Sequence, residues 1–256
     1  MTGEFAFLDH PGPLAFAHRG AHGPDGPGEN TMAAFAAAVD HGYRYLETDV
    51  HLTADGVVVA FHDDHLDRVT TNMTGAIAQR PWSEVSQAKV GPDGGPVPRL
   101  DEILSTWPDV RVNIDPKHDR VVDALADVID AAGATDRVCC GAFDDARLAR
   151  LRERLGPRLC TSLGPRSTRR VAGAVLGAPA GDLTGPCVQV PTHIRRVRLV
   201  TPRFVRVAHD LGLQVHVWTI DSPAEMRSLL DMGVDGLMTD HADRLKHVLQ
   251  SRGEWA

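Results

Sequence analysis

The sequence predicts an α/β fold in which eight parallel strands close into a single (β/α)8 barrel. The chain has 256 residues, close to the roughly 250 residues typical of such a barrel. Eight short apolar runs recur along it, and most are separated by stretches with helical spacing. Near-continuous apolar runs are typical of strands buried on both faces of a parallel sheet. Eight such units favour a closed barrel over an open sheet.

Each apolar run marks one expected strand. In chain order the runs are Leu14–Ala17, Tyr45–Asp49, Val110–Asp115, Val138–Phe143, Arg158–Leu163, Cys187–Pro191, Gln214–Ile220 and Asp235–Asp240. Helical periodicity lies between them at Thr31–Asp40, Val121–Ala132, Asp145–Leu155, Pro202–Leu211 and Pro223–Met232. We expect Asn30 to cap the first of these helices, because asparagine is a favoured N-cap residue.

One stretch breaks the alternation of strands and helices. Val57–Phe61 reads as a strand, but it follows the second run too closely for a crossover helix. Between them stands Ala54-Asp55-Gly56, and Asp-Gly favours a tight hairpin turn. We therefore expect an antiparallel return strand that places His62 opposite Thr48 of the second strand.

The remaining irregular segment is an expected insertion. Residues 63–99 are rich in Gly, Pro, Asn and Thr and show little periodicity, apart from a helix-like patch near Ser83–Lys89. We expect this segment to pack over one side of the barrel mouth, after the second strand. The whole chain, residues 1–256, is then a single barrel domain.

Composition limits the classes of partner. The formal net charge is −7, and nucleic-acid binding usually requires a basic stripe. The short clusters Arg169-Arg170 and Arg195 to Arg198 are expected to be solvated surface charges, so we expect no nucleic-acid partner. No apolar run reaches the about 18 residues of a membrane span, and we expect no transmembrane segment. The composition does not fix the oligomeric state.

Two features of the sequence bear on localisation, namely the first residues and the cysteines. Residues 1–13 carry acidic groups and lack the basic and apolar regions of a secretory signal. Cys139, Cys140, Cys160 and Cys187 lie in apolar runs without a C-x-x-C pattern. We expect them to be buried, reduced core residues rather than zinc ligands, and we expect a cytoplasmic protein.

Polar residues end several of the expected strands, and the carboxyl ends of barrel strands share one rim. Glu47 and Asp49 are two residues apart on one strand, so their side chains share a face. With Asp115 they would form a set of carboxylates that suits a hard divalent cation such as Mg²⁺, Ca²⁺ or Mn²⁺. Such a cation neutralises phosphate oxygens.

Two histidines and two cations complete the expected chemistry. His18 and His62 are the natural acid–base pair, because histidine titrates near neutrality. Arg19 can bind phosphate oxygens as a fork, and Lys117 can add a point charge. The residues do not decide which histidine is the base.

At these residues the chain resembles the glycerophosphodiester phosphodiesterase family. The matching motifs are His18-Arg19-Gly20, Glu29-Asn30-Thr31, the stretch from Glu47 to Gly56, Phe61-His62-Asp63, Leu66-Asp67-Arg68 through Thr74-Gly75, Val217-Trp218-Thr219, Gly233-Val234-Asp235-Gly236 and Thr239-Asp240. One such motif is weak, but the ordered set covers nearly the whole chain.

The resemblance implies a metal-dependent TIM-barrel hydrolase that converts glycerophosphodiesters to sn-glycerol 3-phosphate and an alcohol. It implies one divalent cation, Mg²⁺ or Ca²⁺, with Mn²⁺ as a further candidate. The roles it implies are Glu47, Asp49 and Asp115 as metal ligands, His18 and His62 as the catalytic pair, Arg19 and Lys117 as phosphate contacts, and Glu29 and Trp218 as residues that line the substrate site. The family often has glutamate where Asp115 stands and asparagine where Asp221 stands.

Two other functions stay open at this point. A phospholipase-D-like enzyme acting on lysophospholipids or sphingolipids needs an apolar approach to the mouth. Met73, Ile77, Trp82 and Val85 of the insertion are scattered, so we expect no such approach and poor turnover of lysophospholipids. A non-catalytic barrel that binds phosphoesters usually lacks an acid, a base or a metal ligand, whereas every expected position here holds a competent group.

Overall fold

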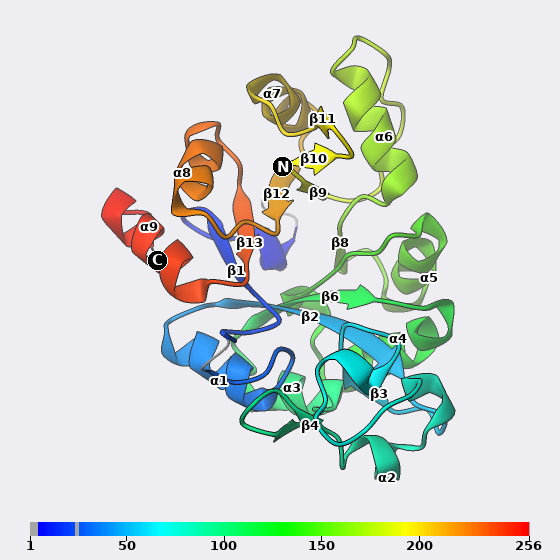
Figure 1. The fold of residues 1–256 in the computed structure, drawn as a ribbon. Coiled ribbons are helices and arrows are strands. Elements are labelled where there is room, and N and C mark those ends of the chain that lie inside the picture. Colours follow the sequence, from blue (N-terminus) through cyan, green and yellow to red (C-terminus); the bar gives the residue numbers. More distant parts are fainter. Residues whose placement is uncertain (1–4, 24–25, 256) are drawn as a thin grey trace.

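The computed structural model describes residues 5–23 and 26–255, and eight parallel strands form its central sheet (Figure 1). The strands are β1 (Leu14–His18), β2 (Tyr45–Leu52), β6 (Arg111–Pro116), β7 (Val138–Cys140), β8 (Cys160–Thr161), β9 (Cys187–Pro191), β12 (Gln214–Trp218) and β13 (Gly236–Thr239). Each overlaps one of the eight predicted runs, so the strand prediction is confirmed.

The sheet curves until its two ends meet. Its parallel pairing follows the order β8-β7-β6-β2-β1-β13-β12-β9. A parallel bridge between Ser162 and Cys187 joins the ends, and the Leu163 amide donates to the Cys187 carbonyl oxygen at 2.8 Å. The nearly closed barrel confirms the predicted (β/α)8 architecture, although this seam is held by far fewer backbone pairs than the β2–β6 junction.

Helices cover the outside of the barrel (Figure 1). They are α1 (Met32–Asp40), α3 (Leu100–Thr106), α4 (Val122–Ala131), α5 (Asp145–Leu155), α6 (Pro165–Ala174), α7 (Pro202–Asp210), α8 (Pro223–Asp231) and α9 (Ala242–Arg252). The five helices predicted from periodicity are all present. In the described part of the chain, no helix combines the length and apolar character needed to cross a membrane.

The predicted cap of α1 is wrong. Thr31 is the N-cap residue, and its side chain accepts a hydrogen bond from the Ala34 amide. Asn30 instead has a φ of 55° and is buried. Its side chain points to β2, where it accepts from the Thr48 hydroxyl at 2.7 Å and donates to Asp49 at 3.3 Å.

The return strand β3 (Val58–Ala60) pairs antiparallel with β2. Val50 pairs with Ala60, and the Phe61 amide donates to the Asp49 carbonyl oxygen at 2.9 Å. These contacts follow the register predicted from the Asp-Gly turn, and His62 comes directly after Phe61 at the end of the return strand. The hairpin therefore brings His62 to the rim beside the β2 carboxylates.

The segment after β3 builds a small layer of its own. It contains η2 (Leu66–Arg68), η3 (Ile77–Gln79), α2 (Trp82–Val85) and the antiparallel pair β4 (Lys89–Val90) and β5 (Gly95–Pro96). Together with Val59 of β3, its apolar residues form a cluster that is separate from the barrel core: Phe61, Leu66, Ile77, Val85, Ala88, Val90 and Val97. Arg68 of this layer reaches the first strand–helix loop, where it pairs with Glu29 at 2.7 Å.

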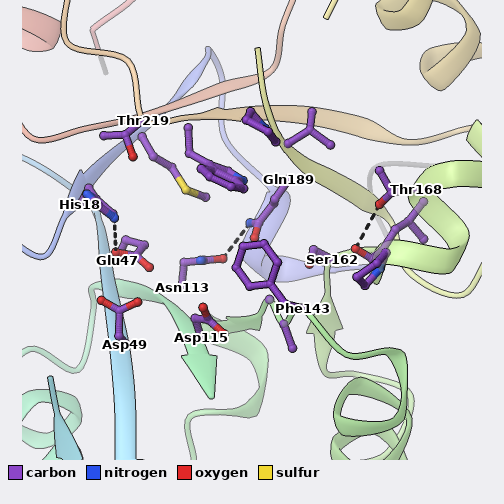
Figure 2. Close-up of a pocket in the computed structure, with 18 of the residues that line it drawn as sticks. His18, Glu47, Asp49, Asn113, Asp115, Phe143, Ser162, Thr168, Gln189 and Thr219 are labelled. Carbon is purple, nitrogen blue, oxygen red and sulfur yellow. Dashed lines mark hydrogen bonds and ion pairs between the residues drawn. The ribbon is translucent and has the colours of Figure 1, made fainter. Parts of the chain in front are cut away.

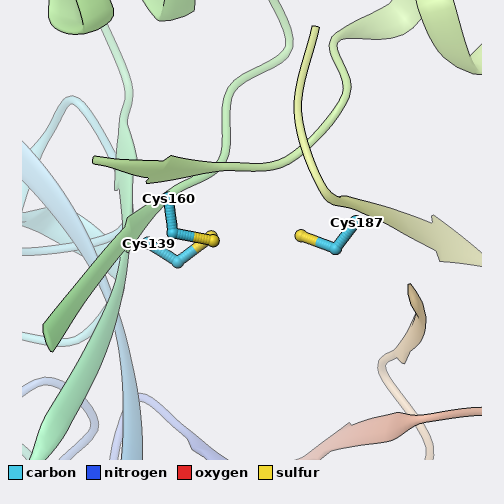
Figure 3. A group of neighbouring side chains, drawn as sticks. All are labelled: Cys139, Cys160 and Cys187. Atoms are coloured by element: carbon cyan, nitrogen blue, oxygen red, sulfur yellow. The ribbon is translucent and has the colours of Figure 1, made fainter. Parts of the chain in front are cut away.

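Three cysteines meet in the barrel interior. The Sγ atoms of Cys139, Cys160 and Cys187 all lie within 4.8 Å of one another (Figure 3), in an apolar cluster that also contains Phe16. Cys140 belongs instead to the core beneath α4 and α5. All four cysteines are buried free thiols, as predicted, and burial raises the pKa of Cys140 to about 12.

Candidate active site

A cavity of about 550 Å³ opens at the carboxyl ends of the strands (Figure 2). Parallel barrels place their functional residues at this rim. Eight of the predicted site residues line the cavity: His18, Arg19, Glu47, Asp49, His62, Asp115, Lys117 and Trp218. Residues that are far apart in the sequence therefore converge, as predicted from the ends of the strands.

Strand register brings the carboxylates together. Glu47 pairs with Asn113 and Asp49 with Asp115 across the β2–β6 junction, and alternate residues of each strand face inward. All three acids are buried. Burial and the neighbouring Asp49 raise the pKa of Glu47 to about 7, and burial also raises the pKa of Asp115. Concentrated negative charge is therefore the dominant property of this wall.

Two basic side chains, Lys117 and Arg19, balance that charge. The Lys117 Nζ atom lies 2.6 Å from Asp49 Oδ1 and 2.8 Å from Asp115 Oδ2. The Arg19 Nε atom lies 3.2 Å from Asp49 Oδ2. Burial opposes the charge of Asp49, but Lys117 and Arg19 outweigh it and lower its pKa. The carboxylates likewise raise the pKa of Lys117 against the effect of burial.

The donor set of this wall fits a hard divalent cation. Oxygen ligands are those that Mg²⁺ and Ca²⁺ prefer. Asp115 Oδ1 is buried and has no hydrogen-bond partner among the described residues, so one oxygen is free to bind an ion. In the described part of the chain, the oxygens of the three carboxylates do not all lie within 4.8 Å of one another. Lys117 lies between two of them as a counter-ion.

His18 is oriented by an aspartate that the sequence analysis did not assign. Ala17 pairs with Thr239 between β1 and β13, which sets His18 beside Asp240. The His18 Nδ1–H group donates to Asp240 Oδ1 at 2.5 Å, while Nε2 lies 3.7 Å from Glu47 Oε2. Burial lowers the pKa of His18, but Glu47 and Asp240 outweigh it, so the net pKa is raised.

The Asp240 carboxylate is itself held in place. It also accepts from His22 Nε2 at 3.3 Å, and these histidines lower the pKa of Asp240 although burial opposes its charge. Asp221 accepts from the Asp240 amide at 2.9 Å and from the Thr239 hydroxyl at 3.0 Å. An aspartate at position 221 therefore supplies the acceptor that fixes this end of β13.

His62 has a similar partner. Its Nδ1–H group donates to Asp63 Oδ1 at 2.5 Å. Asp63 in turn accepts from Arg68 Nε at 2.6 Å, and this hydrogen bond is the main reason that the pKa of Asp63 is lowered to about 2. This pair is visible in the sequence, because His62 and Asp63 are adjacent residues directly after the return strand.

Glu29 does not line the cavity. Its carboxylate accepts from Arg19 Nη1 at 3.0 Å and from two Arg68 nitrogens at 2.7 and 2.8 Å. Burial opposes its charge, but these hydrogen bonds lower the pKa of Glu29. In this geometry Glu29 positions Arg19, whose backbone has a φ of 57°. A contact between Glu29 and substrate stays a prediction.

The opposite wall is apolar. Trp218 packs edge-on against Phe143, with ring centroids 5.8 Å apart, and Figure 2 shows Phe143 across the cavity from His18 and Glu47. The sequence analysis counted Phe143 as the last residue of the run Val138–Phe143 and gave it no role in the site. In the structure β7 ends at Cys140, and Phe143 lies in the loop that follows.

Comparisons with known proteins agree with this geometry. Residues 18–244 match the family model described as "Glycerophosphoryl diester phosphodiesterase family". The chain is 40% identical over 254 residues to the Mycobacterium tuberculosis protein named "Probable glycerophosphodiester phosphodiesterase 2". The aligned region covers 97% of this chain and 95% of that protein.

Solved structures show the same fold. A crystal structure from Silicibacter pomeroyi, whose name assigns it to this family, has a TM-score of 0.83 at 30% identity and covers 98% of this chain and 100% of that one. An Oleispira antarctica phosphodiesterase was solved in complex with the product sn-glycerol-3-phosphate. It has a TM-score of 0.76 at 22% identity, and the match covers 93% of this chain and 97% of that one. The chain therefore belongs to the glycerophosphoryl diester phosphodiesterase family and is an enzyme of that class.

Proposed function

We propose that this enzyme hydrolyses glycerophosphodiesters to sn-glycerol 3-phosphate and an alcohol, with one divalent cation and with His18 and His62 as its proton-transfer pair. The observation that carries the proposal is the convergence of two histidine–aspartate pairs on one wall of buried carboxylates. Such an arrangement suits the cleavage of a diester, which needs a base for the nucleophile and an acid for the leaving oxygen.

Glu47, Asp49 and Asp115 would hold the cation, which we take to be Mg²⁺ or Ca²⁺, with Mn²⁺ as a further candidate. When bound, such an ion neutralises phosphate oxygens and stabilises the charge of the transition state. The free oxygen of Asp115 and the raised pKa of Glu47 support this choice, because a cation relieves the repulsion between the carboxylates.

The two histidines do the proton transfer. Asp240 accepts from Nδ1 of His18, and Asp63 accepts from Nδ1 of His62, so each ring presents Nε2 for chemistry. One Nε2 accepts a proton from the attacking hydroxyl, and the other donates one to the departing alcohol oxygen. Fixing the tautomer and the ring orientation in this way is the ordinary role of a carboxylate behind a catalytic histidine.

Arg19 and Lys117 are the proposed phosphate contacts. Both line the cavity beside the carboxylates, where a diester phosphate can replace part of their carboxylate contacts. The product complex of the Oleispira relative supports sn-glycerol 3-phosphate as the product. We further propose that the enzyme acts in the cytoplasm on small-molecule substrates.

The test is a panel of glycerophosphocholine, glycerophosphoethanolamine and glycerophosphoglycerol, assayed for sn-glycerol 3-phosphate. Each substrate is tested after treatment with chelator and after each of Mg²⁺, Ca²⁺ and Mn²⁺ is restored. We expect turnover to disappear with chelator and to return with at least one ion. Full activity in the presence of chelator would exclude the metal, and no turnover with any ion would exclude the reaction.

A further inference from the structure

Three cysteine thiols converge inside the barrel, away from the cavity. Cys139 and Cys160 are paired residues of the neighbouring strands β7 and β8, and Cys187 is the first residue of β9. In Figure 3 the side chains of Cys139 and Cys160 point toward that of Cys187. None of the three lines the cavity, so the cluster is separate from the proposed catalytic site.

The fold, and not the spacing of the sequence, brings these thiols together. Each comes from a different strand, so no C-x-x-C pattern marks them, and the expectation that they are only core residues rested on that missing pattern. Residues in register on neighbouring parallel strands point to the same face of the sheet. Cys140 follows Cys139 directly and points to the other face, into the core beneath α4 and α5.

The separations of the sulfurs suit a single metal ion. All three Sγ atoms lie within 4.8 Å of one another. At a sulfur–metal distance of about 2.3 Å, three sulfurs around one ion lie roughly 4 Å apart. Small side-chain rotations therefore bring all three sulfurs to one ion. The three side chains are at most 1% exposed, so bulk water does not compete for such an ion.

The number and kind of donors favour Cu⁺. Thiolates are soft ligands that select Cu⁺ and Zn²⁺ over Mg²⁺ and Ca²⁺. Structural zinc takes four ligands, but among the described residues no histidine or carboxylate joins the three sulfurs within the same distance. His216 also faces the barrel interior, where it contacts Phe16. Gln189 donates to its Nδ1 atom at 3.4 Å, and its Nε2–H group donates to Gln214 at 3.1 Å, so both of its nitrogens are engaged.

The balance of charge supports the same ion. The cluster lies among apolar side chains such as Phe16 and Tyr45, where an uncompensated charge is costly. Burial raises the pKa of Cys139 and of Cys160, so each proton removed from these thiols carries a cost. A monovalent ion is neutralised by the loss of one thiol proton, whereas a divalent ion requires the loss of two.

We propose that Cys139, Cys160 and Cys187 form a three-coordinate site for Cu⁺. Binding forms three sulfur–copper bonds and releases one thiol proton to solvent, and copper and sulfur keep their oxidation states. The ion connects β7, β8 and β9 across the seam of the barrel, which is held by the bridge between Ser162 and Cys187. It therefore stabilises the closed barrel, and local opening of the seam gives it access to the buried thiols.

The experiment measures Cu⁺ binding to the whole chain, kept anaerobic and reduced, in competition with a chromogenic Cu⁺ chelator. Because the thiols are buried, the ion is offered both to the folded protein and during refolding from urea. We expect one Cu⁺ per chain, with three sulfur neighbours in X-ray absorption spectra. The unfolding temperature should rise by about 5–10 °C when free Cu⁺ is about a hundredfold above Kd, because the ion binds the folded state.

Cys160→Ala and Cys187→Ala should each lower the affinity for Cu⁺ by at least about 100-fold, because each removes a direct ligand. Both should also lose the rise in unfolding temperature. Cys140→Ala is the matched control, since it removes an equally buried thiol that lies outside the cluster, and it should bind Cu⁺ like the wild type. Thermal unfolding without the ion shows that each variant is folded, and Cys139→Ala replaces either test variant that is not.

A wild-type affinity no higher than that of Cys187→Ala would overturn the proposal, and so would loss of binding in Cys140→Ala. Preferential binding of Zn²⁺ over Cu⁺ in the same competition would overturn the choice of ion. The readouts are affinity, sulfur coordination and unfolding temperature, so none of these results depends on the proposed hydrolysis.

Discussion

Asp240→Asn tests whether the carboxylate behind His18 is part of the catalytic machinery. The carboxylate accepts the Nδ1–H bond of His18 at 2.5 Å and does not line the cavity, so it acts through the histidine. An amide of the same size can turn its NH₂ group to the ring and favour the other tautomer, which leaves Nε2 in the wrong state. The substitution should therefore lower kcat while the fold is kept.

The magnitude follows from the same contact. A general acid or base contributes about 10²–10⁴-fold to the rate, and Asp240 cannot contribute more than the histidine through which it acts. We expect a loss of about 10²-fold in kcat, equivalent to ~2.7 kcal/mol of transition-state stabilisation. Steady-state choline release from glycerophosphocholine, at saturating cation, measures it, and thermal unfolding confirms that the variant is folded.

A double-mutant cycle tests whether Asp240 acts through His18. In a His18→Ala background, Asp240→Asn should cause little further loss, because residues that act as one unit are not additive. Full additivity of the two losses would show that Asp240 does not work through His18. His22→Gln is the control, because His22 binds the same carboxylate at 3.3 Å but does not line the cavity. It should change kcat by less than about threefold, well below the general-base contribution.

Three further outcomes are expected. Asp49→Asn should weaken calorimetric binding of the activating cation at least tenfold, and an unchanged affinity would mean that the metal site is misassigned. His62→Ala should lower kcat by about 10²–10⁴-fold with normal folding, and a variant as fast as wild type would reject the proposed mechanism. Hydrogen bonding from Arg68 holds the pKa of Asp63 at about 2, below the ordinary value of about 3.9. Its stabilisation is therefore present above pH ~4 and lost as the pH falls toward 2. Asp63→Asn should reduce the acid-dependent loss of stability in that window, as followed by urea unfolding, and an unchanged pH dependence would contradict this.

The strands and the β2–β3 hairpin could be predicted because local chemistry determines them. Apolar runs identify strands buried on both faces, and the Asp55-Gly56 turn fixes the hairpin register. The closure of the barrel could not be derived in this way, because β8 contains only two residues and the seam depends on one bridge, Ser162 to Cys187. Only the number of repeated units indicated that the two ends would meet.

The site residues also fall into those that local sequence patterns predict and those that depend on distant contacts. Alternation on β2 placed Glu47 and Asp49 on one face, so the charged wall was visible in the sequence. Asn30 was assigned to a helix cap because capping is a local pattern, whereas its partners on β2 are separated from it by 18 and 19 residues. Asp240 could have been found, because in a closed barrel the last strand pairs with the first and so reaches His18.

The structure also joins two sets of residues that the sequence treats separately. The proposed phosphate contacts, Lys117 and Arg19, are the counter-ions of the proposed metal ligands, with Lys117 within 2.8 Å of both Asp49 and Asp115. A divalent cation among these carboxylates would compete with both side chains for the same oxygens, and it would thereby free positive charge for an anionic ligand. Linkage would then require the converse, that a bound phosphate diester favours the cation. We therefore propose that the charged wall would work as one unit, in which the cation and the substrate phosphate would each strengthen the binding of the other.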